Sequence, residues 1–222
     1  MNVRVQDVRY FLAVPTTLNF TRAAEDVRNG DLPRGIKVLK DLSAEPSEDC
    51  LDEGRAMMQI IHDVAPGAKQ SFYTAFESQA DFAAGIIALA DDGAQVIVDD
   101  IIYFAETMFE HGAIADAVEK VAKRGVAYFS AAGNDARQSY QASFRNSGRP
   151  GALEGAVRHD FDPARNKIDA LQQITADDET VTVLALNWDE PSVSANGVRG
   201  SRSDLDLIFY DAAGVPLEVC SD

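Results

Sequence analysis

The chain has 222 residues, of which 46% are hydrophobic and 25% are charged, so it is long enough to bury a core as one large domain or two small ones. Its 36 acidic and 20 basic side chains give a formal net charge of −16, and a field of that sign repels nucleic-acid phosphates and anionic lipid. The composition excludes a disordered, collagen-like or disulfide-rich chain and disfavours nucleic acid and membranes as partners.

Neither a membrane span nor a metal centre is predicted. The apolar stretches are far shorter than the roughly 20 residues that a span requires, and the apolar run 10–14 is shorter than the core of a secretory signal. We therefore expect a cytoplasmic protein as encoded. Cys50 and Cys220 are too few for a zinc site, and the three histidines show no metal-ligand spacing. Unpaired thiols are the simplest interpretation, and a disulfide between the two cysteines stays open.

Residues 1–26 are predicted to contain a short amphipathic helix, a turn and the start of a second helix. Val8, Phe11 and Leu12 fall on one helical face, and Asn19 is placed to cap a helix that begins just after it. This segment is too short to fold alone.

Residues 35–134 alternate apolar strand-like runs with helical patterns, which is typical of a parallel sheet covered by helices. The helix over 53–64 should bury a stripe made of Ala56, Met57, Ile60, Ile61 and Val64. The expected strands are 36–39, 71–75, 95–98 and 126–129, and the other expected helices are 80–90 and 113–124. In such sheets the chemistry lies beyond the carboxyl ends of the strands.

From residue 151 the helical periodicity gives way to short alternating runs at 180–186, 205–210 and 217–220, which predict a partial antiparallel β-sandwich. Asp204 and Asp206 would share one strand face and could bind calcium together with Asp189 or Glu190. A solvated sheet face is the simpler interpretation of these carboxylates, so no cofactor is expected.

Two runs, Asp52–Met57 and Gly125–Asn134, resemble the subtilisin-like and sedolisin-like serine peptidases. The resemblance implies acyl transfer to a serine, with peptides or proteins as substrates of an intact, exported relative. It assigns Asn134 as the donor to the oxyanion and Glu53 as the candidate base. It also implies that the strand ending in Asp99 and Asp100 binds substrate.

The sequence departs from this family at three places. Met57 stands where a sedolisin-like pair would have its second carboxylate, one helical turn after Glu53. No Gly-Thr-Ser turn supplies a nucleophile, and residues 1–26 have no counterpart of the first strand and its aspartate. Because an oxyanion donor accelerates acyl transfer only alongside a nucleophile and a base, we expect an incomplete and inactive peptidase domain.

A second resemblance concerns the first segment. The runs Val8–Val14 and Leu18–Glu25 resemble the start of the helix-turn-helix of LysR-type transcription regulators, and residues 32–42 would then be the recognition helix. That helix is incompatible with a strand over 36–39. A DNA-binding regulator fragment is the alternative function, and five early arginines (4, 9, 22, 28 and 34) agree with it.

Together these patterns predict an α/β fold in three parts: a LysR-like helical stub over 1–26, a partial subtilisin-like core over 27–150 and a β-rich insertion over 151–222. The core is a parallel sheet flanked by helices. A third possible function is an inert module that clasps peptides on the edge of the strand 96–100.

Overall fold

The structure, a computed structural model, describes residues 9–10, 12–13, 20–42, 53–134, 139–162, 164, 167–174, 184–211 and 213–217. The chain divides into two compact units. The first unit comprises Met1–Asn134 and Asn187–Ser201, and the second unit comprises Asp135–Leu186 and Arg202–Asp222.

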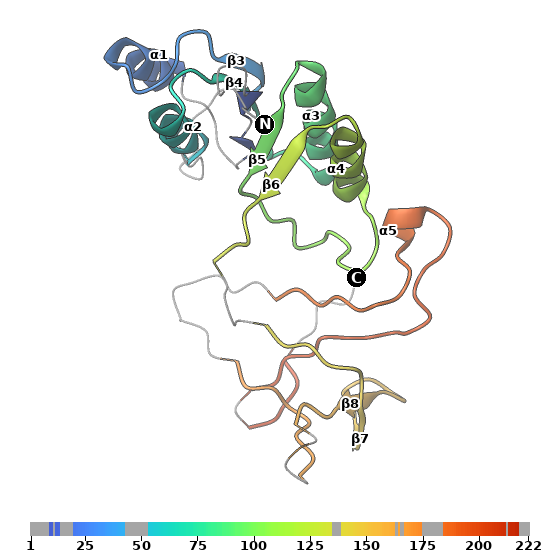
Figure 1. Cartoon of the computed structure of the whole chain (residues 1–222). Helices are drawn as coiled ribbons and strands as arrows, with labels where there is room; N and C mark the ends of the chain where they lie inside the picture. Colours follow the sequence, from blue (N-terminus) through green and yellow to red (C-terminus); the bar gives the residue numbers. More distant parts are fainter. Residues whose placement is uncertain are drawn as a thin grey trace. The chain divides into compact units, whose positions relative to one another are not determined.

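The first unit is a mixed α/β structure (Figure 1). Each helix and strand that the sequence predicts between residues 35 and 134 is present, with ends that differ by a few residues at most. Its elements are β1 (Arg9–Tyr10), β2 (Leu12–Ala13), α1 (Phe20–Asn29), β3 (Lys37–Lys40), α2 (Glu53–Val64), β4 (Lys69–Tyr73), α3 (Gln79–Asp91), β5 (Val96–Asp99), α4 (Ala113–Lys123), β6 (Ala127–Ser130) and α5 (Val193–Asn196).

All strand pairings in the first unit are parallel among the described residues. The strand orders are β1-β4-β3 and β2-β5-β6. Since a single residue separates β1 from β2, these two short strands link the two three-stranded sheets. Arg9 is in register with Lys69 of β4, and Ala13 is in register with Asp99 of β5.

The prediction of an amphipathic helix at the start of the chain is wrong. Residues 9–10 and 12–13 are strands, and each pairs with a strand that comes much later in the sequence. A short apolar run cannot be assigned to helix or strand by its periodicity alone, so the pairing partners decided the outcome. The second predicted helix, after Asn19, is confirmed as α1.

The prediction of a LysR-like recognition helix over 32–42 is also wrong. Residues 37–40 form β3, which pairs with β4, and Gly35 before it has a left-handed φ of 85°. A helix cannot continue through that conformation at low energy, and Pro33 is compatible only with a helix start. The competing prediction of a strand over 36–39 is confirmed.

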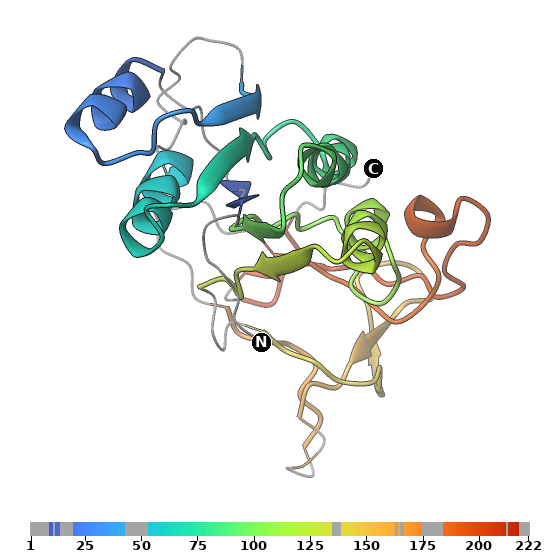
Figure 2. The ribbon, with the colours of Figure 1, turned by 45° about the horizontal axis from the view of Figure 1, so that its top comes forward.

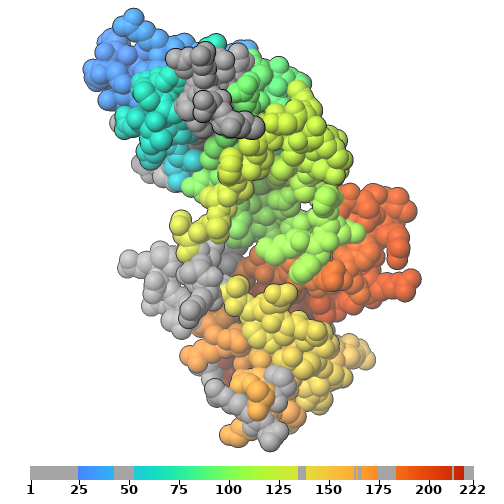
Figure 3. Space-filling model, in the orientation of Figure 1, coloured from blue at the N-terminus to red at the C-terminus, as the bar shows by residue number. Residues whose placement is uncertain are grey.

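Two hydrophobic clusters lie on opposite faces of the sheet. On one face, Phe72 of β4 packs with Leu32 and with Met58 of α2. Figure 1 shows α1 and α2 side by side there, and in Figure 3 the blue atoms from residue 25 onwards lie against the teal atoms of α2. On the other face, Ile97 of β5 packs against α3 and α4, and Figure 2 shows these two helices side by side. The fully buried side chains that the two helices contribute to this second cluster are Phe82, Ile86, Leu89 and Val121.

The buried stripe of α2 differs from the prediction. Gly54 and Met58 are buried and Met57 and Ile61 are half-buried, so the stripe follows positions i, i+3, i+4 and i+7. The predicted stripe shares Met57 and Ile61 but included Ala56, Ile60 and Val64, which are exposed, Val64 by 82%.

The second unit contains an antiparallel hairpin of β7 (Asn146–Pro150) and β8 (Val157–His159). Residues 205–210, predicted as a strand, form no strand, and only an isolated bridge joins Tyr210 to Pro216. Most of the predicted runs 180–186 and 217–220 lie outside the described residues. The hairpin escaped prediction because Asn146–Pro150 is polar and contains a glycine and a proline, which are typical of turns.

Across the described ranges, no helix is both long and apolar enough to cross a membrane.

Candidate functional site

The last residues of two neighbouring parallel strands meet at the carboxyl edge of the sheet. Asp99 ends β5 and Ser130 ends β6, and the two are in register. The Ser130 hydroxyl donates a 2.7 Å hydrogen bond to Oδ1 of Asp99, and the Ala131 N–H donates a 3.0 Å bond to the Asp99 carbonyl. Asp99 is only 3% exposed, so these contacts hold a buried carboxyl group at the place where open α/β sheets carry their sites.

Burial dominates the electrostatics of this carboxyl group. Loss of solvent raises the pKa of Asp99 above its ordinary range, and the charge of Asp100 adds to the rise, while the hydrogen bond from Ser130 partly offsets it. The Tyr128 hydroxyl lies buried beside Asp99, at a geometry that falls short of a standard hydrogen bond. Burial first and the Asp99 charge second raise the pKa of the Tyr128 phenol far above its usual range.

Two side chains from the segment after β5 complete this group. Burial and then the Asp99 charge raise the pKa of Glu106. The Tyr103 hydroxyl donates to the Ala75 carbonyl, and burial followed by the charge of Asp81 raises the pKa of Tyr103 to about 12. We call Asp99, Tyr103, Glu106, Tyr128 and Ser130 the carboxyl-edge cluster.

The chemistry that this cluster can perform is proton exchange and hydrogen bonding. Burial raises the proton affinity of both carboxyl groups, so each keeps its proton to a higher pH than an exposed carboxyl group does, and the phenol and alcohol groups around them donate or accept hydrogen bonds. The cluster holds no imidazole or thiol, so it has no strong nucleophile or base at neutral pH.

A separate ion cluster lies at the carboxyl ends of the neighbouring strands β3 and β4. The Lys40 ammonium lies 2.6 Å from Glu77 and 2.7 Å from Asp81, and Tyr73 donates a 3.1 Å hydrogen bond to Asp81. The hydrogen bonds that Lys40 donates to Asp81 and Glu77 raise the pKa of Lys40, so it stays charged. This arrangement fixes the start of α3 on the sheet and is structural.

The predicted site residues lie in different surroundings. Glu53 is the exposed first residue of α2, and Asn134 is exposed in the turn that follows β6, directly after Gly133 with a φ of 74°. Asp99 is buried and Asp100 is half-buried. Among the described contacts, no hydrogen bond or ion pair joins Glu53 to Asn134 or to either aspartate, so the base and the oxyanion donor remain predictions.

Met57 stands at the position where the resemblance to sedolisin-like peptidases would place a second carboxylate. Its side chain is half-buried and packs against the cluster of Leu32, Met58 and Phe72. A carboxylate there would lose its hydration without gaining a partner, which is unfavourable. The apolar packing of Met57 therefore agrees with the departure from the sedolisin-like pattern that the sequence shows.

Sequence reasoning missed Glu106, Tyr103, Tyr128 and Ser130. The available signal was positional: Tyr128 lies on the predicted strand 126–129 and Ser130 follows it two positions after Tyr128, so in β6 the two residues share one face. Glu106 gave no such signal, because it comes from an irregular segment whose path only the fold determines.

The strand 96–100 is paired on both sides over part of its length. β5 pairs with β6 from Val96 to Asp99 on one side and with β2 at Val98 and Asp99 on the other. This pairing disfavours an added peptide strand at Val98 and Asp99, and peptide binding on the edge of this strand stays a prediction.

Metal-ligating groups are sparse. In the part of the chain that the structure describes, only His111, Asp116 and Glu119 bring three suitable atoms together, and all three are exposed. Glu119 also forms a 2.8 Å ion pair with Lys123. Asp204 and Asp206 are exposed outside any strand and belong to no such group within the described residues, so the shared strand face that suggested calcium is not formed.

Comparison with known proteins gives a limited result. No family model matches the chain, and no curated protein matches it either. One solved structure that is similar is the self-cleaved protease domain of PatA, with a TM-score of 0.36 and 17% sequence identity. The match covers 58% of this chain and 50% of that one, so this chain spans about half the length of that domain.

Proposed function

We propose that the first unit is a remnant of a serine peptidase of the subtilisin-like and sedolisin-like type, which binds extended peptides at the carboxyl edge of its sheet and does not hydrolyse them. The observation that carries the proposal is a set of exposed apolar side chains beside a polar cluster at that edge. Ile102, Phe104, Met108 and Phe109 follow β5, and they are 46–69% exposed.

Exposed apolar groups of this kind mark a binding surface when they are contiguous in a segment and bordered by polar groups. Phe129 of β6 is also 60% exposed, so both strands that end at this edge present apolar side chains. Asp100 and Glu106 contribute acidic groups to the same segment. We therefore expect peptides with apolar and basic side chains to bind better than acidic ones.

The absence of turnover follows from the chemistry of the residues present. The one serine hydroxyl described in the cluster, on Ser130, donates to Asp99 rather than to an imidazole. His62 lies on α2 and His111 lies 3.9 Å from Asp116, so neither is hydrogen-bonded to Ser130. Without an activated nucleophile, an oxyanion donor such as Asn134 has no intermediate to stabilise.

The test combines a binding and a hydrolysis measurement on the full chain. Fluorescence polarisation with labelled apolar-basic and apolar-acidic peptides should show saturable binding that favours the basic peptide. Phe129→Ala should weaken it, while Ile60→Ala, which removes an equally exposed side chain on α2, should not.

Fluorogenic peptides incubated from pH 4 to pH 8 should remain uncut. Hydrolysis that Asn134→Ala abolishes would show an active peptidase. A lack of saturable binding, or equal effects of the two alanine variants, would refute the peptide-binding surface.

A further inference from the structure

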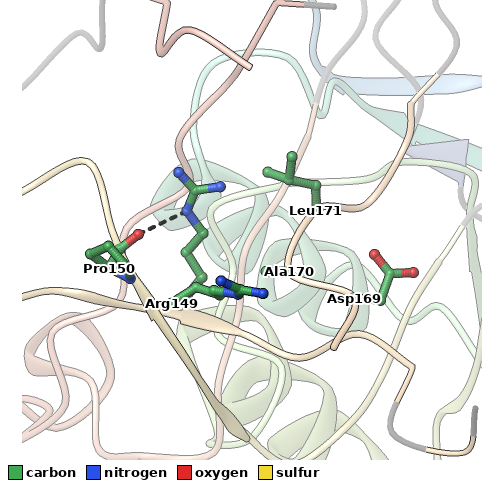
Figure 4. Close-up of a pocket in the computed structure, with 6 residues that line it drawn as sticks. Arg149, Pro150, Asp169, Ala170 and Leu171 are labelled. Carbon is green, nitrogen blue, oxygen red and sulfur yellow. Dashed lines mark hydrogen bonds between the residues drawn. The ribbon is translucent and has the colours of Figure 1, made fainter. Parts of the chain in front are cut away.

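The second unit contains a pocket that is unrelated to the carboxyl edge of the sheet. It has a volume of about 320 Å³ and lies over the β7–β8 hairpin (Figure 4). Its lining residues are Arg149, Pro150, Arg158, Asp169, Ala170 and Leu171. All six belong to the second unit, so the pocket is a property of that unit alone.

One of the two arginines is held rigidly. Nε of Arg158 donates a 2.9 Å hydrogen bond to the Pro150 carbonyl, the bond drawn in Figure 4. Its guanidinium carbon lies 4.5 Å from the ring centroid of Tyr210, a cation–π contact. These two contacts leave the terminal nitrogens of the guanidinium group available and fix the plane in which they lie.

The hairpin beneath the pocket is closely packed. Gly151 follows β7, and a Cβ at that position would come 2.8 Å from the Cβ of Ala156. The Gly151 N–H donates a 2.8 Å hydrogen bond to the Ala156 carbonyl. Because Arg149 and Arg158 come from the two strands that this contact joins, the spacing of the two side chains is set by the backbone.

The positive charge in the pocket is not neutralised by a contact within the protein. Among the described residues, neither Arg149 nor Arg158 forms an ion pair with a carboxylate, although the chain as a whole carries a net charge of −16. Asp169 lines the pocket without lying within ion-pair distance of either arginine. Two guanidinium groups and one carboxylate leave a net positive charge of one, which suits a monoanion better than a dianion.

The remaining wall is apolar. Pro150, Ala170 and Leu171 line it, and Leu171 is 45% exposed. Figure 4 places the Leu171 side chain on the far side of the pocket from Pro150. A ligand can therefore contact hydrocarbon while its charged end reaches the arginines.

From these features we infer that this pocket binds a carboxylate that carries an apolar substituent. A guanidinium group matches the two oxygens of a carboxylate with two parallel hydrogen bonds, and Leu171 supplies the contact for the substituent. The source of the carboxylate is either a free small molecule or the C-terminus of a peptide. Neither source depends on the peptide surface proposed for the first unit.

The probe for the test is N-acetyl-leucine, with N-acetyl-leucine amide as the uncharged control and inorganic phosphate as the dianion. Titration calorimetry on the full chain should show saturable binding of the acid and none of the amide. Arg149→Gln should weaken binding by about tenfold or more, because it removes a charge-assisted contact. Arg199→Gln removes the same charge from the first unit and should leave affinity unchanged.

Two further variants test the chemistry of the pocket. Asp169→Asn should tighten binding of the acid, and Leu171→Ala should reduce the preference for N-acetyl-leucine over acetate. In NMR spectra of the unaltered chain, the Nε–H signals of Arg149 and Arg158 should shift as N-acetyl-leucine is added. This measurement needs no variant, so it tests the proposal even if a variant fails to fold. A tripeptide ending in leucine, measured in parallel, separates a peptide terminus from a free small molecule as the better ligand.

The proposal is overturned by an absence of saturable binding, by equal affinities of the Arg149→Gln and Arg199→Gln variants, or by tighter binding of phosphate than of N-acetyl-leucine. None of these outcomes depends on peptide binding by the first unit, so the two proposals can fail separately.

Discussion

The Ser130 hydroxyl donates a 2.7 Å hydrogen bond to Oδ1 of Asp99, and this contact joins the ends of β6 and β5. The two residues are 31 positions apart in the sequence and are brought into register by the parallel pairing of their strands. The bond satisfies one oxygen of a buried carboxyl group, yet burial still raises the pKa of Asp99. Ionisation of Asp99 therefore destabilises the folded protein, because the charge is buried at the carboxyl edge.

Asp99→Asn should remove the buried negative charge while keeping a side-chain oxygen that accepts the hydrogen bond from Ser130. Because the folded pKa of Asp99 is raised, the folded state binds the proton more tightly than the unfolded state. The protonated Asp99 side chain therefore stabilises the folded state at low pH. This contribution to the free energy of unfolding is lost as the pH rises from about 3.9, the unfolded pKa, through the folded pKa. The asparagine variant should gain stability relative to the wild type over that rise.

Urea unfolding between pH 3 and pH 7.5 measures the difference. Asp63→Asn, at an exposed position on α2, is the matched control and should give a curve parallel to the wild type. A parallel curve for Asp99→Asn as well would contradict the buried charge.

His159 should make the second unit sensitive to mild acid. Its Nδ1 accepts a 3.0 Å hydrogen bond from the Arg145 N–H, and its Nε2 lies 3.0 Å from the Tyr140 hydroxyl, which donates to the Phe161 carbonyl. These partners assign the neutral ring with its proton on Nε2. Protonation of Nδ1 would break the bond from Arg145.

Burial first and the Arg145 charge second lower the pKa of His159, while the charge of Asp160 acts in the opposite direction. The unfolded state therefore takes up the proton before the folded state does, and stability falls as the pH drops below about 6.5 towards the lowered folded pKa. An NMR titration of the His159 ring protons gives the folded midpoint directly. A midpoint at or above 6.5 would argue against the prediction, and His111→Gln should leave the pH dependence of unfolding in place.

Ile86 and Ile60 provide a matched test of the core. Both are isoleucines in helices, but Ile86 is 0% exposed on α3 and Ile60 is 62% exposed on α2. Ile86→Ala should lower the free energy of unfolding by about 2–5 kcal/mol, and Ile60→Ala should change it by about 0.5 kcal/mol or less. Denaturant unfolding of the two variants measures both values, and similar losses would mean that α3 does not pack as described.

DNA binding is not expected of this chain. The helix that would read a groove is replaced by β3, and the net charge of −16 opposes binding to phosphates. A gel shift at about 50 mM salt should show no complex. A specific complex that weakens in the Arg22→Gln and Arg34→Gln variants would restore the regulator function as the leading hypothesis.

The sequence by itself determined the succession of helices and strands from β3 to β6. Each of the helices α2, α3 and α4 repeats its apolar positions over three turns or more, and β5 and β6 are apolar runs bounded by turn residues. Patterns of this length are local, so they are legible without knowledge of the fold. The sequence also predicted that chemistry-bearing residues would gather where the strands end, since Asp99 closes a buried run.

Only the tertiary structure decided the features that depend on partners far along the chain. Residues 9–10 and 12–13 became strands because they pair with β4 and β5, and α2 turned its Gly54 and Met58 side inward because Phe72 and Leu32 lie there. The same is true of Ser130 and Glu106, which meet Asp99 only through strand register and the path of a loop. Such outcomes depend on long-range packing and hydrogen bonding, which no local pattern of residues encodes.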